Sequence, residues 1–444
     1  SSALVCWLCG RVHRIHVMAE QEAETTEPPV KRLSFLREED EAFFEEDENR
    51  NQEQAERNAT MRAWLLERRH RVEAEPSQKP TALDEFVTVD RPAPSRPASE
   101  DDQPPWFVMR PSIDNPVLRL HEELLDFFDF MQHTPHELTA RREWVQTVTD
   151  SCRELWPGCK VRVFGSFYTG LSLPNGDVDI AVTDVPCKQG TAMKILADRM
   201  LANGDVSWLE IIESAKVPVV KLRSQACGLR ADIVINVPDG IDSSKYVRDR
   251  LKEYPQMRPL LVFLKYFLLQ RGLHETFTGG MGSYLLCNVV LHFLQRHPAR
   301  HNPRQYLSTS LGHLLFDFLK YYGQEFQYER QCISVAEGGN TFNKSDRGFK
   351  GKGKGKGKQL CVESPLDSNV DLGAACFKMP VLRNLFSHSF HCICALYLNR
   401  SPPENSMLCP FLLDPKHPVI TDRHKLLIEQ PVALRGLPRA SERA

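Results

Sequence analysis

The sequence predicts an α/β domain followed by a helical domain. Between residues 160 and 237, strand-like apolar runs surround an amphipathic helix at 189–201, a pattern typical of a small mixed sheet backed by helices. Beyond this point, the apolar runs at 257–271, 284–296 and 308–328 have the length and periodicity of helices. A chain of 444 residues with 41% hydrophobic content is long enough for two packed domains and additional tails.

Composition narrows the class of protein. The formal net charge is −2, so the whole chain has no electrostatic bias toward nucleic acid, and any RNA binding must come from local patches. The 13 cysteines show no regular disulfide-like spacing, which favours reduced thiols. No stretch reaches 18 unbroken apolar residues, so we expect no membrane partner. These features indicate a soluble intracellular enzyme.

Both ends of the chain lack the pattern of a packed domain. Residues 1–104 are acidic, charged and Pro-containing, and we expect them to be disordered; they could dock a partner protein or simply be solvated. Residues 399–444 are rich in Pro and Arg and are expected to form a C-terminal tail. The predicted α/β domain therefore occupies 105–245, and the helical domain occupies 246–398.

A helix start is predicted just before the sheet. The sequence Thr134-Pro135-His136-Glu137 offers an N-cap hydroxyl, Pro at the first helical position and Glu at the third. We expect a helix to begin at Pro135 and to run toward Trp156.

Three aspartates are the candidate catalytic and metal-binding residues. Asp177 and Asp179 lie two apart in an apolar strand, so they share one face while Val178 and Ile180 face an apolar layer. Oxygen ligands on one face suit a divalent cation. Asp232, in the apolar run RADIVIN, supplies a third carboxylate, although alone it could be a capping aspartate. The triad could bind two ions and activate a 3′-hydroxyl.

Several residues around the aspartates are suited to a nucleotide. Gly165 permits close backbone approach to a phosphate, and the Ser166 hydroxyl can bond phosphate oxygens or only cap the turn. Lys265 is the one charged misfit between Leu260 and Leu269, and its ammonium suits the β- and γ-phosphates. Three glycines precede Ser283 and Tyr284, where free amides face a phosphate and the ring can stack on a base or pack in the core.

Five segments together resemble the non-canonical poly(A) polymerases. The resemblance is to the group that acts in nuclear RNA surveillance, as in the TRAMP complex, within the DNA polymerase β-like nucleotidyltransferase superfamily. It covers roughly residues 105–398, with the motifs in the family's order. The segments are GSFYTGLSLPNGDVDIAV (165–182), VPVVKLRS (217–224), LVFLKYFLLQRGL (261–273), TGGMGSYLL (278–286) and SLGHLLFDFLKYYGQEFQY (310–328).

This resemblance implies a fold and an activity. The fold is a polymerase β-like nucleotidyltransferase domain beside a helical PAP-associated central domain, with the nucleotide in the cleft between them. The activity is template-independent transfer of adenosine from ATP to an RNA 3′ end with Mg²⁺ or Mn²⁺. Ser166 and Lys265 would hold the triphosphate, and Ser243 and Ser244 would lie near the ribose. The family also implies a zinc-knuckle RNA-binding protein and an RNA helicase as partners, and a nuclear location, with the cytoplasm as the alternative.

The base-recognition loop departs from the family pattern. Residues 360–373 (LCVESPLDSNVDLG) resemble that loop, but Ser364 stands where an acidic residue is usual. Val370 stands where uridine-adding relatives have His and adenosine-adding relatives have Asn, and Asn369 is adjacent. A uridylyl or mixed-nucleotide transferase therefore remains an alternative. A catalytically silent RNA-binding scaffold is a second alternative, against which the retained carboxylates argue.

Candidate RNA contacts lie in two places. Lys221 and Arg223 share one face of a strand, and in relatives a basic residue there approaches the acceptor strand; a surface salt bridge is the alternative. A Gly/Lys insertion at 337–359 cannot bury a core and is expected to be flexible. It either contacts RNA phosphates in a salt-dependent way or is only a tolerated loop insertion. Its alternating lysines are Lys350, Lys352, Lys354, Lys356 and Lys358.

Overall fold

The structure is a computed structural model that describes most of the chain beyond residue 102. The described residues are 13–16, 103–215, 217–301, 309–346, 360–398, 402, 404–409 and 411–429. Nearly all of them belong to one compact unit, formed by Ser1–Ala19 and Pro104–Gly436. Within these residues, no helix is both long enough and apolar enough to cross a membrane.

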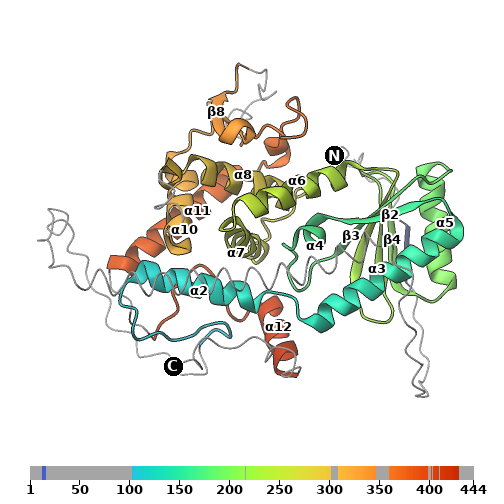
Figure 1. Cartoon of the computed structure of the whole chain (residues 1–444), viewed down its shortest axis with the longest axis horizontal. Coiled ribbons are helices and arrows are strands. Elements are labelled where there is room, and N and C mark those ends of the chain that lie inside the picture. The colour runs from blue at the N-terminus through green and yellow to red at the C-terminus, as the bar shows by residue number, and fades with distance from the viewer. Residues whose placement is uncertain are drawn as a thin grey trace, which may run out of the picture. The chain divides into compact units, whose positions relative to one another are not determined.

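A six-stranded mixed sheet forms the first half of this unit (Figure 1). The strand order is β1-β4-β5-β6-β3-β2, and only β3 and β6 pair in parallel. The mixed sheet agrees with the sequence prediction, whereas β1 lies in the stretch that was expected to be disordered. The strands are β1 (His13–His16), β2 (Lys160–Phe164), β3 (Val178–Thr183), β4 (Val206–Ile212), β5 (Val219–Ser224) and β6 (Arg230–Ile235).

The face of β3 that was predicted to be apolar is packed. Val178, Ile180 and Val182 are all completely buried. Helices α3 (Pro135–Leu155) and α5 (Gln189–Ala202) lie against the sheet. The Thr134 hydroxyl and the Glu137 carboxylate form the predicted capping box at the start of α3. The helices thus cover one face and leave the carboxylate-bearing positions of β3 and β6 free of the core.

A cluster of helices forms the second half (Figure 1). Its centre is α7, whose apolar residues, among them Leu261, Phe263 and Phe267, are almost fully buried. The run at 308–328 was expected to be one helix. The α-helix α10 ends at Lys320, and the chain continues as the π-helical turn η3 (Tyr321–Glu325). The main helices are α2 (Pro116–Phe130), α6 (Asp239–Glu253), α7 (Met257–Leu269), α8 (Ser283–Arg296), α10 (Leu311–Lys320), α11 (Met379–Leu398) and α12 (Pro418–Glu429).

Short elements complete the described chain. The five-residue helix α4 (Gly165–Thr169) follows β2, and the two-stranded sheet β7–β8 follows η3. The others are η2 (Pro298–His301), β7 (Gln331–Ser334), η4 (Ala336–Gly338), β8 (Asn340–Asn343) and η6 (Leu372–Ala375).

The C-terminal segment corrects the prediction that residues 399–444 form a tail. Residues 404–409 and 411–429, which we call the C-terminal segment, include α12 and contribute to the hydrophobic core of the helical half. Leu408, Leu412, Leu413 and Ile420 are at most 1% exposed. The segment contacts α2 and the end of α7, because the Met407 amide donates to Glu123 and the Leu412 carbonyl accepts a hydrogen bond of 2.8 Å from Gln270.

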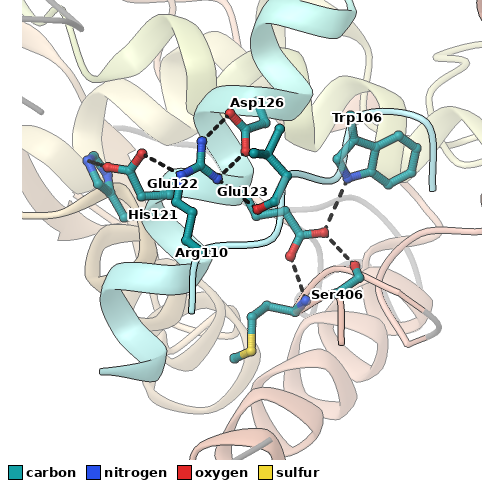
Figure 2. Close-up of polar contacts among 9 residues, drawn as sticks. Trp106, Arg110, His121, Glu122, Glu123, Asp126 and Ser406 are labelled. Carbon is teal, nitrogen blue, oxygen red and sulfur yellow. Dashed lines mark hydrogen bonds and ion pairs between the residues drawn. The ribbon is translucent and has the colours of Figure 1, made fainter. Parts of the chain in front are cut away.

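A buried carboxylate joins this segment to α2 (Figure 2). Glu123 accepts hydrogen bonds from the Trp106 indole (3.2 Å), from the Met407 amide (2.5 Å) and from the Ser406 hydroxyl. Burial raises the pKa of Glu123 to about 7, although these donors favour the ionised form. Hydrogen bonds to Glu123 therefore attach the C-terminal segment to α2.

Candidate active site

The three predicted catalytic aspartates lie on neighbouring strands. Asp179 and Asp232 are direct partners in the parallel pair β3–β6, and Asp177 precedes β3 by one residue. Burial, followed by the charges of Asp232 and Asp177, raises the pKa of Asp179 to about 7. Carboxylates that repel one another at a partly buried site are stabilised by a bound cation.

Asp232 has a protein partner. The Lys221 ammonium lies 2.6 Å from its carboxylate and neutralises part of the charge of the triad. In the part of the chain that the structure describes, no three His, Cys, Asp or Glu side chains converge closely enough to hold a metal ion. A metal site formed by all three aspartates therefore requires their carboxylates to come closer together.

Gly165 allows the chain to pass over Asp179. It has φ +69°, and a Cβ built there would lie 1.9 Å from the Asp179 Oδ2 atom. The next residue, Ser166, donates its backbone amide to Asp179, which favours the ionised carboxylate. The Gly-Ser pair, expected to form a turn, starts the short helix α4 and lies directly against the Asp179 carboxylate.

A cavity of about 430 Å³ brings the predicted nucleotide-binding residues together. Its wall combines Asp179 with every predicted nucleotide-binding residue except Asn369, namely Gly165, Ser166, Ser243, Ser244, Lys265, Ser283 and Tyr284. The wall comes from β3 and α4 on one side and from α6, α7 and α8 on the other. Sequence reasoning missed the apolar lining, which includes Leu171, Val247 and Cys287, because such residues give no signal beyond ordinary core packing.

Lys265 is partly buried on α7 and faces this cavity. Its ammonium donates to the Leu171 carbonyl at 2.7 Å. Burial lowers its pKa, while Cys287 and Asp179 oppose that shift. An ammonium has three donors, so Lys265 can bind an anionic ligand in the cavity while keeping or exchanging this carbonyl.

Ser243 and Ser244 lie on α6. The helix begins at Asp239, so the serines belong to its second turn. The Ser244 hydroxyl accepts from the Gly165 amide and donates to the Gly240 carbonyl, both at 2.7 Å. Ser243 donates to the Asp239 carbonyl at 2.9 Å. In this structure Ser244 holds Gly165 in place, and both side chains still line the cavity.

Residues 360–373 contribute no side chain to the wall of the cavity, whereas Tyr284 does. Burial raises the pKa of the Tyr284 phenol. Asn369 is exposed and bonds the Asp367 carboxylate at 3.0 Å through its backbone and its side chain. Asn369 therefore lies outside the cavity wall in this conformation.

The predicted RNA contacts are not brought together. Lys221 is engaged with Asp232, which is the ion-pair alternative that the sequence left open. Arg223 is exposed and donates to the Gly228 carbonyl at 3.2 Å. The lysines from Lys350 to Lys358 lie outside the described residues.

A second cation on α7 was missed in the sequence. Arg258 is 5% exposed and donates to the Gly170 carbonyl at 2.7 Å, so it contacts the same loop as Lys265. Gly170 has φ +67°, and a Cβ there would lie 2.3 Å from the Arg258 guanidinium. The signal was the one that revealed Lys265, a charge in an apolar helix.

Two protein families match the chain. The family described as the central palm domain of mitochondrial-like poly(A) RNA polymerase matches residues 120–248, and the Cid1 family of poly A polymerases matches residues 310–370. The Poly(A) RNA polymerase CID14 of Cryptococcus neoformans is 31% identical over 62% of this chain and 36% of its own length. The inactive non-canonical poly(A) RNA polymerase protein Trf4-2 of Drosophila melanogaster is 32% identical over 58% of this chain and 64% of its own. The chain thus spans less than two thirds of either relative.

Solved structures establish the fold. The polymerase core of TRAMP, an RNA surveillance complex, superposes with a TM-score of 0.63 at 24% identity, over 70% of this chain and 99% of that one. The Cid1 poly(U) polymerase with MgGTP bound superposes with a TM-score of 0.54 at 18% identity, over 65% of this chain and 97% of that one. The chain therefore has the polymerase β-like nucleotidyltransferase fold with a helical PAP-associated half, as the sequence predicted.

Proposed function

Because the chain belongs to the non-canonical poly(A) polymerase family, we propose that it adds adenosine residues from ATP to RNA 3′ ends without a template. One observation carries the proposal. A single cavity joins the catalytic carboxylate Asp179 to an ammonium, two hydroxyls and an aromatic ring, contributed by Lys265, Ser166, Ser283 and Tyr284.

The aspartates fit divalent cations. Asp177, Asp179 and Asp232 offer hard oxygen donors on adjacent strands, and the repulsion that raises the pKa of Asp179 is relieved by positive charge. We propose Mg²⁺, or Mn²⁺, as the ion, which agrees with the MgGTP-bound state of the Cid1 poly(U) polymerase. When bound, a pair of such ions lowers the pKa of the attacking hydroxyl and stabilises charge on the leaving oxygen.

The residues around the cavity have separate tasks. Lys265, Ser166 and Ser283 bind the triphosphate, and Tyr284 stacks on the base. Asp232 lies beside the RNA 3′-hydroxyl, and Lys221 holds that carboxylate until substrates bind. The hydroxyl oxygen then attacks the α-phosphate in line, and pyrophosphate leaves.

Specificity for adenosine is one of two possibilities for the choice of base, and the other is addition of uridine or of mixed nucleotides. Val370 is 41% exposed and Asn369 is bonded to Asp367, so neither of them reads a base in this conformation. A uridylyl or mixed-nucleotide transferase would use the same carboxylates and phosphate ligands. Because the Drosophila relative is described as inactive, a catalytically silent RNA-binding scaffold is the second alternative for this chain.

The partners and the compartment are proposed from the resemblance to the RNA-surveillance poly(A) polymerases, and the similarity to the TRAMP polymerase core supports them. We propose an RNA-binding zinc-knuckle protein and an RNA helicase as the factors that select substrates, and the nucleus as the compartment. Tailing would then direct the RNA to processing or decay.

A tailing assay tests the proposal. Purified protein with Mg²⁺ and an unstructured labelled RNA is offered ATP, UTP, GTP and CTP separately, beside an Asp177→Ala/Asp179→Ala control. Extension with ATP that is absent from the control is expected. Extension mainly with UTP would retain the chemistry and overturn the specificity, and no extension with any nucleotide, even with a candidate partner added, would favour the scaffold.

A further inference from the structure

We propose that Arg141 on α3 is a positioning residue that fixes Asp177 for metal binding. The inference deepens the proposed function, because it takes Asp177 to be a ligand of the cation. It assigns to Arg141 the task of holding the turn Pro174-Asn175-Gly176, from which Asp177 emerges.

Arg141 forms a two-pronged contact with that turn. Its guanidinium donates to the Gly176 carbonyl and to the Pro174 carbonyl, each at 2.8 Å. The turn itself closes through a hydrogen bond of 2.8 Å from the Gly176 amide to the Leu173 carbonyl. A planar guanidinium bonded to two carbonyls fixes orientation as well as distance, which an ammonium cannot do. The carbonyl of Gly176 belongs to the peptide that leads directly into Asp177.

The burial of Arg141 indicates more than a packing role. The side chain is 0% exposed, and none of the ion pairs found among the described residues involves it. Its Nε atom is buried without a hydrogen-bond partner, and the Phe167 ring lies 5.7 Å from the guanidinium carbon. Burying a charge costs several kcal/mol unless it is well compensated, and an apolar side chain of similar size would fill the space at lower cost. What Arg141 supplies and an apolar side chain could not is the pair of hydrogen bonds that fixes the turn.

The same loop is held at its other end by different residues. Arg258 and Lys265 on α7 bond the carbonyls of Gly170 and Leu171. Lys265 also faces the nucleotide cavity, so substrate can draw it away from Leu171. Arg141 comes from the α/β half and does not face that cavity. It therefore keeps Asp177 in place while the α7 contacts change.

The test compares Arg141→Met and Arg141→Lys with Arg142→Met, which removes the neighbouring arginine of the same helix. Mn²⁺ affinity is measured by electron paramagnetic resonance without nucleotide or RNA, and kcat and KM for ATP are measured in the tailing assay. Circular dichroism melting identifies the variants that fold. We expect Arg141→Met to weaken Mn²⁺ binding and to lower kcat by about 10- to 100-fold, as for other residues that orient metal ligands, with KM nearly unchanged. We expect Arg141→Lys to fall between Arg141→Met and wild type, and Arg142→Met to match wild type.

Three outcomes overturn the proposal. One is a folded Arg141→Met protein with wild-type Mn²⁺ affinity and kcat. Another is Arg142→Met having the same effect as Arg141→Met. The third is failure of both Arg141 variants to fold, which would make the residue structural only. If wild-type protein binds Mn²⁺ in an Arg141-dependent way but does not extend RNA, the positioning role stands and the proposed polymerase activity fails.

Discussion

Buried charged side chains hold both the loop at residues 170–176 and the C-terminal segment. The two regions differ in whether these charges border the cavity or are enclosed by protein groups. In the loop at residues 170–176, Arg141, Arg258 and Lys265 donate to backbone carbonyls, and Lys265 also borders the cavity. At the C-terminal segment, the charges of Glu123 and Arg423 are enclosed by hydrogen-bond donors and acceptors of the protein itself. In the first arrangement Lys265 can exchange partners when a ligand arrives, whereas the second arrangement can only hold the fold together.

Arg423 shows the second arrangement most clearly. It is 3% exposed on α12, pairs with the Glu137 carboxylate at the start of α3, and donates to the Phe130 carbonyl at the end of α2 (3.0 Å). These contacts join α12 to the junction between α2 and α3. Variants in the C-terminal segment should therefore change stability, and variants in the loop should change activity.

The largest effect is expected from removing the C-terminal segment. Ending the chain at Leu398 deletes Leu408, Leu412, Leu413 and Ile420, each of which contributes about 1.5–3 kcal/mol through burial. The sum approaches the whole stability of a domain, roughly 5–15 kcal/mol. We expect loss of cooperative melting by circular dichroism, whereas a chain ending at Glu429 should melt as wild type does. Cooperative melting of the shorter chain would show that the segment is dispensable.

The next effect is expected from Arg423→Met. The substitution leaves the Glu137 carboxylate without its partner, which costs about 3–5 kcal/mol of unfolding free energy. Urea denaturation should detect this, and kcat of the folded protein should remain that of wild type. The control is Arg250→Met, which removes a more exposed pair with Glu253 worth less than about 1 kcal/mol. Equal losses in the two variants would contradict the account.

Glu123 predicts a pH dependence of stability. Its pKa is about 7 in the folded chain against 4.5 as the ordinary value, so the folded state binds the proton more tightly than the unfolded state. The contribution of Glu123 should therefore fall as pH rises from about 4.5 to 7, by at most about 3 kcal/mol, and then level off.

Glu123→Gln removes this titration. The difference in unfolding free energy between wild type and Glu123→Gln should decrease across that pH range, with the other carboxylates cancelling. A constant difference from pH 4.5 to 7.5 would mean that Glu123 does not bind its proton more tightly in the folded state.

The smallest effect on stability, and a clear effect on activity, is expected from Gly165→Ala. The new Cβ would meet the Asp179 carboxylate and displace it, and a displacement of about 1 Å can cost roughly 10²-fold in rate. Gly204→Ala is the matched control, because Gly204 has φ +73° and no heavy atom within 4 Å of the built Cβ. Both variants carry similar backbone strain, and only Gly165→Ala adds a steric clash, so Gly165→Ala should melt at or below the temperature of Gly204→Ala and should alone lose tailing. Equal tailing by the two would contradict the close contact.

Local signals explain which parts of the molecule were predictable. The Asp177 and Asp179 face follows from the period of two in a strand, and the α3 start follows from its capping box. Lys265 was visible because a charge stood in an apolar helix. Asp239 and Asp242 occupy the first turn of α6, where acidic residues suit the helix dipole, and Ser243 and Ser244 follow in the second turn.

The remaining features depend on contacts that sequence periodicity does not report. Arg141 and Arg142 are adjacent on one helix, and the sequence does not show that Arg141 contacts a turn more than thirty residues later. The apolar residues of the C-terminal segment are scattered among prolines and charges, so their own pattern does not predict that they join the hydrophobic core.

The most direct test of the central claim is to count the cations that bind with nucleotide. Mn²⁺ bound to the protein is titrated by electron paramagnetic resonance in the presence of α,β-methylene ATP, for wild type and for Asp179→Asn. A working nucleotidyl-transfer site predicts two Mn²⁺ ions per bound nucleotide in wild type and fewer in Asp179→Asn. Binding of Mn²⁺ that is absent, or that is the same in both proteins, would contradict the account and place the chain with the inactive relative.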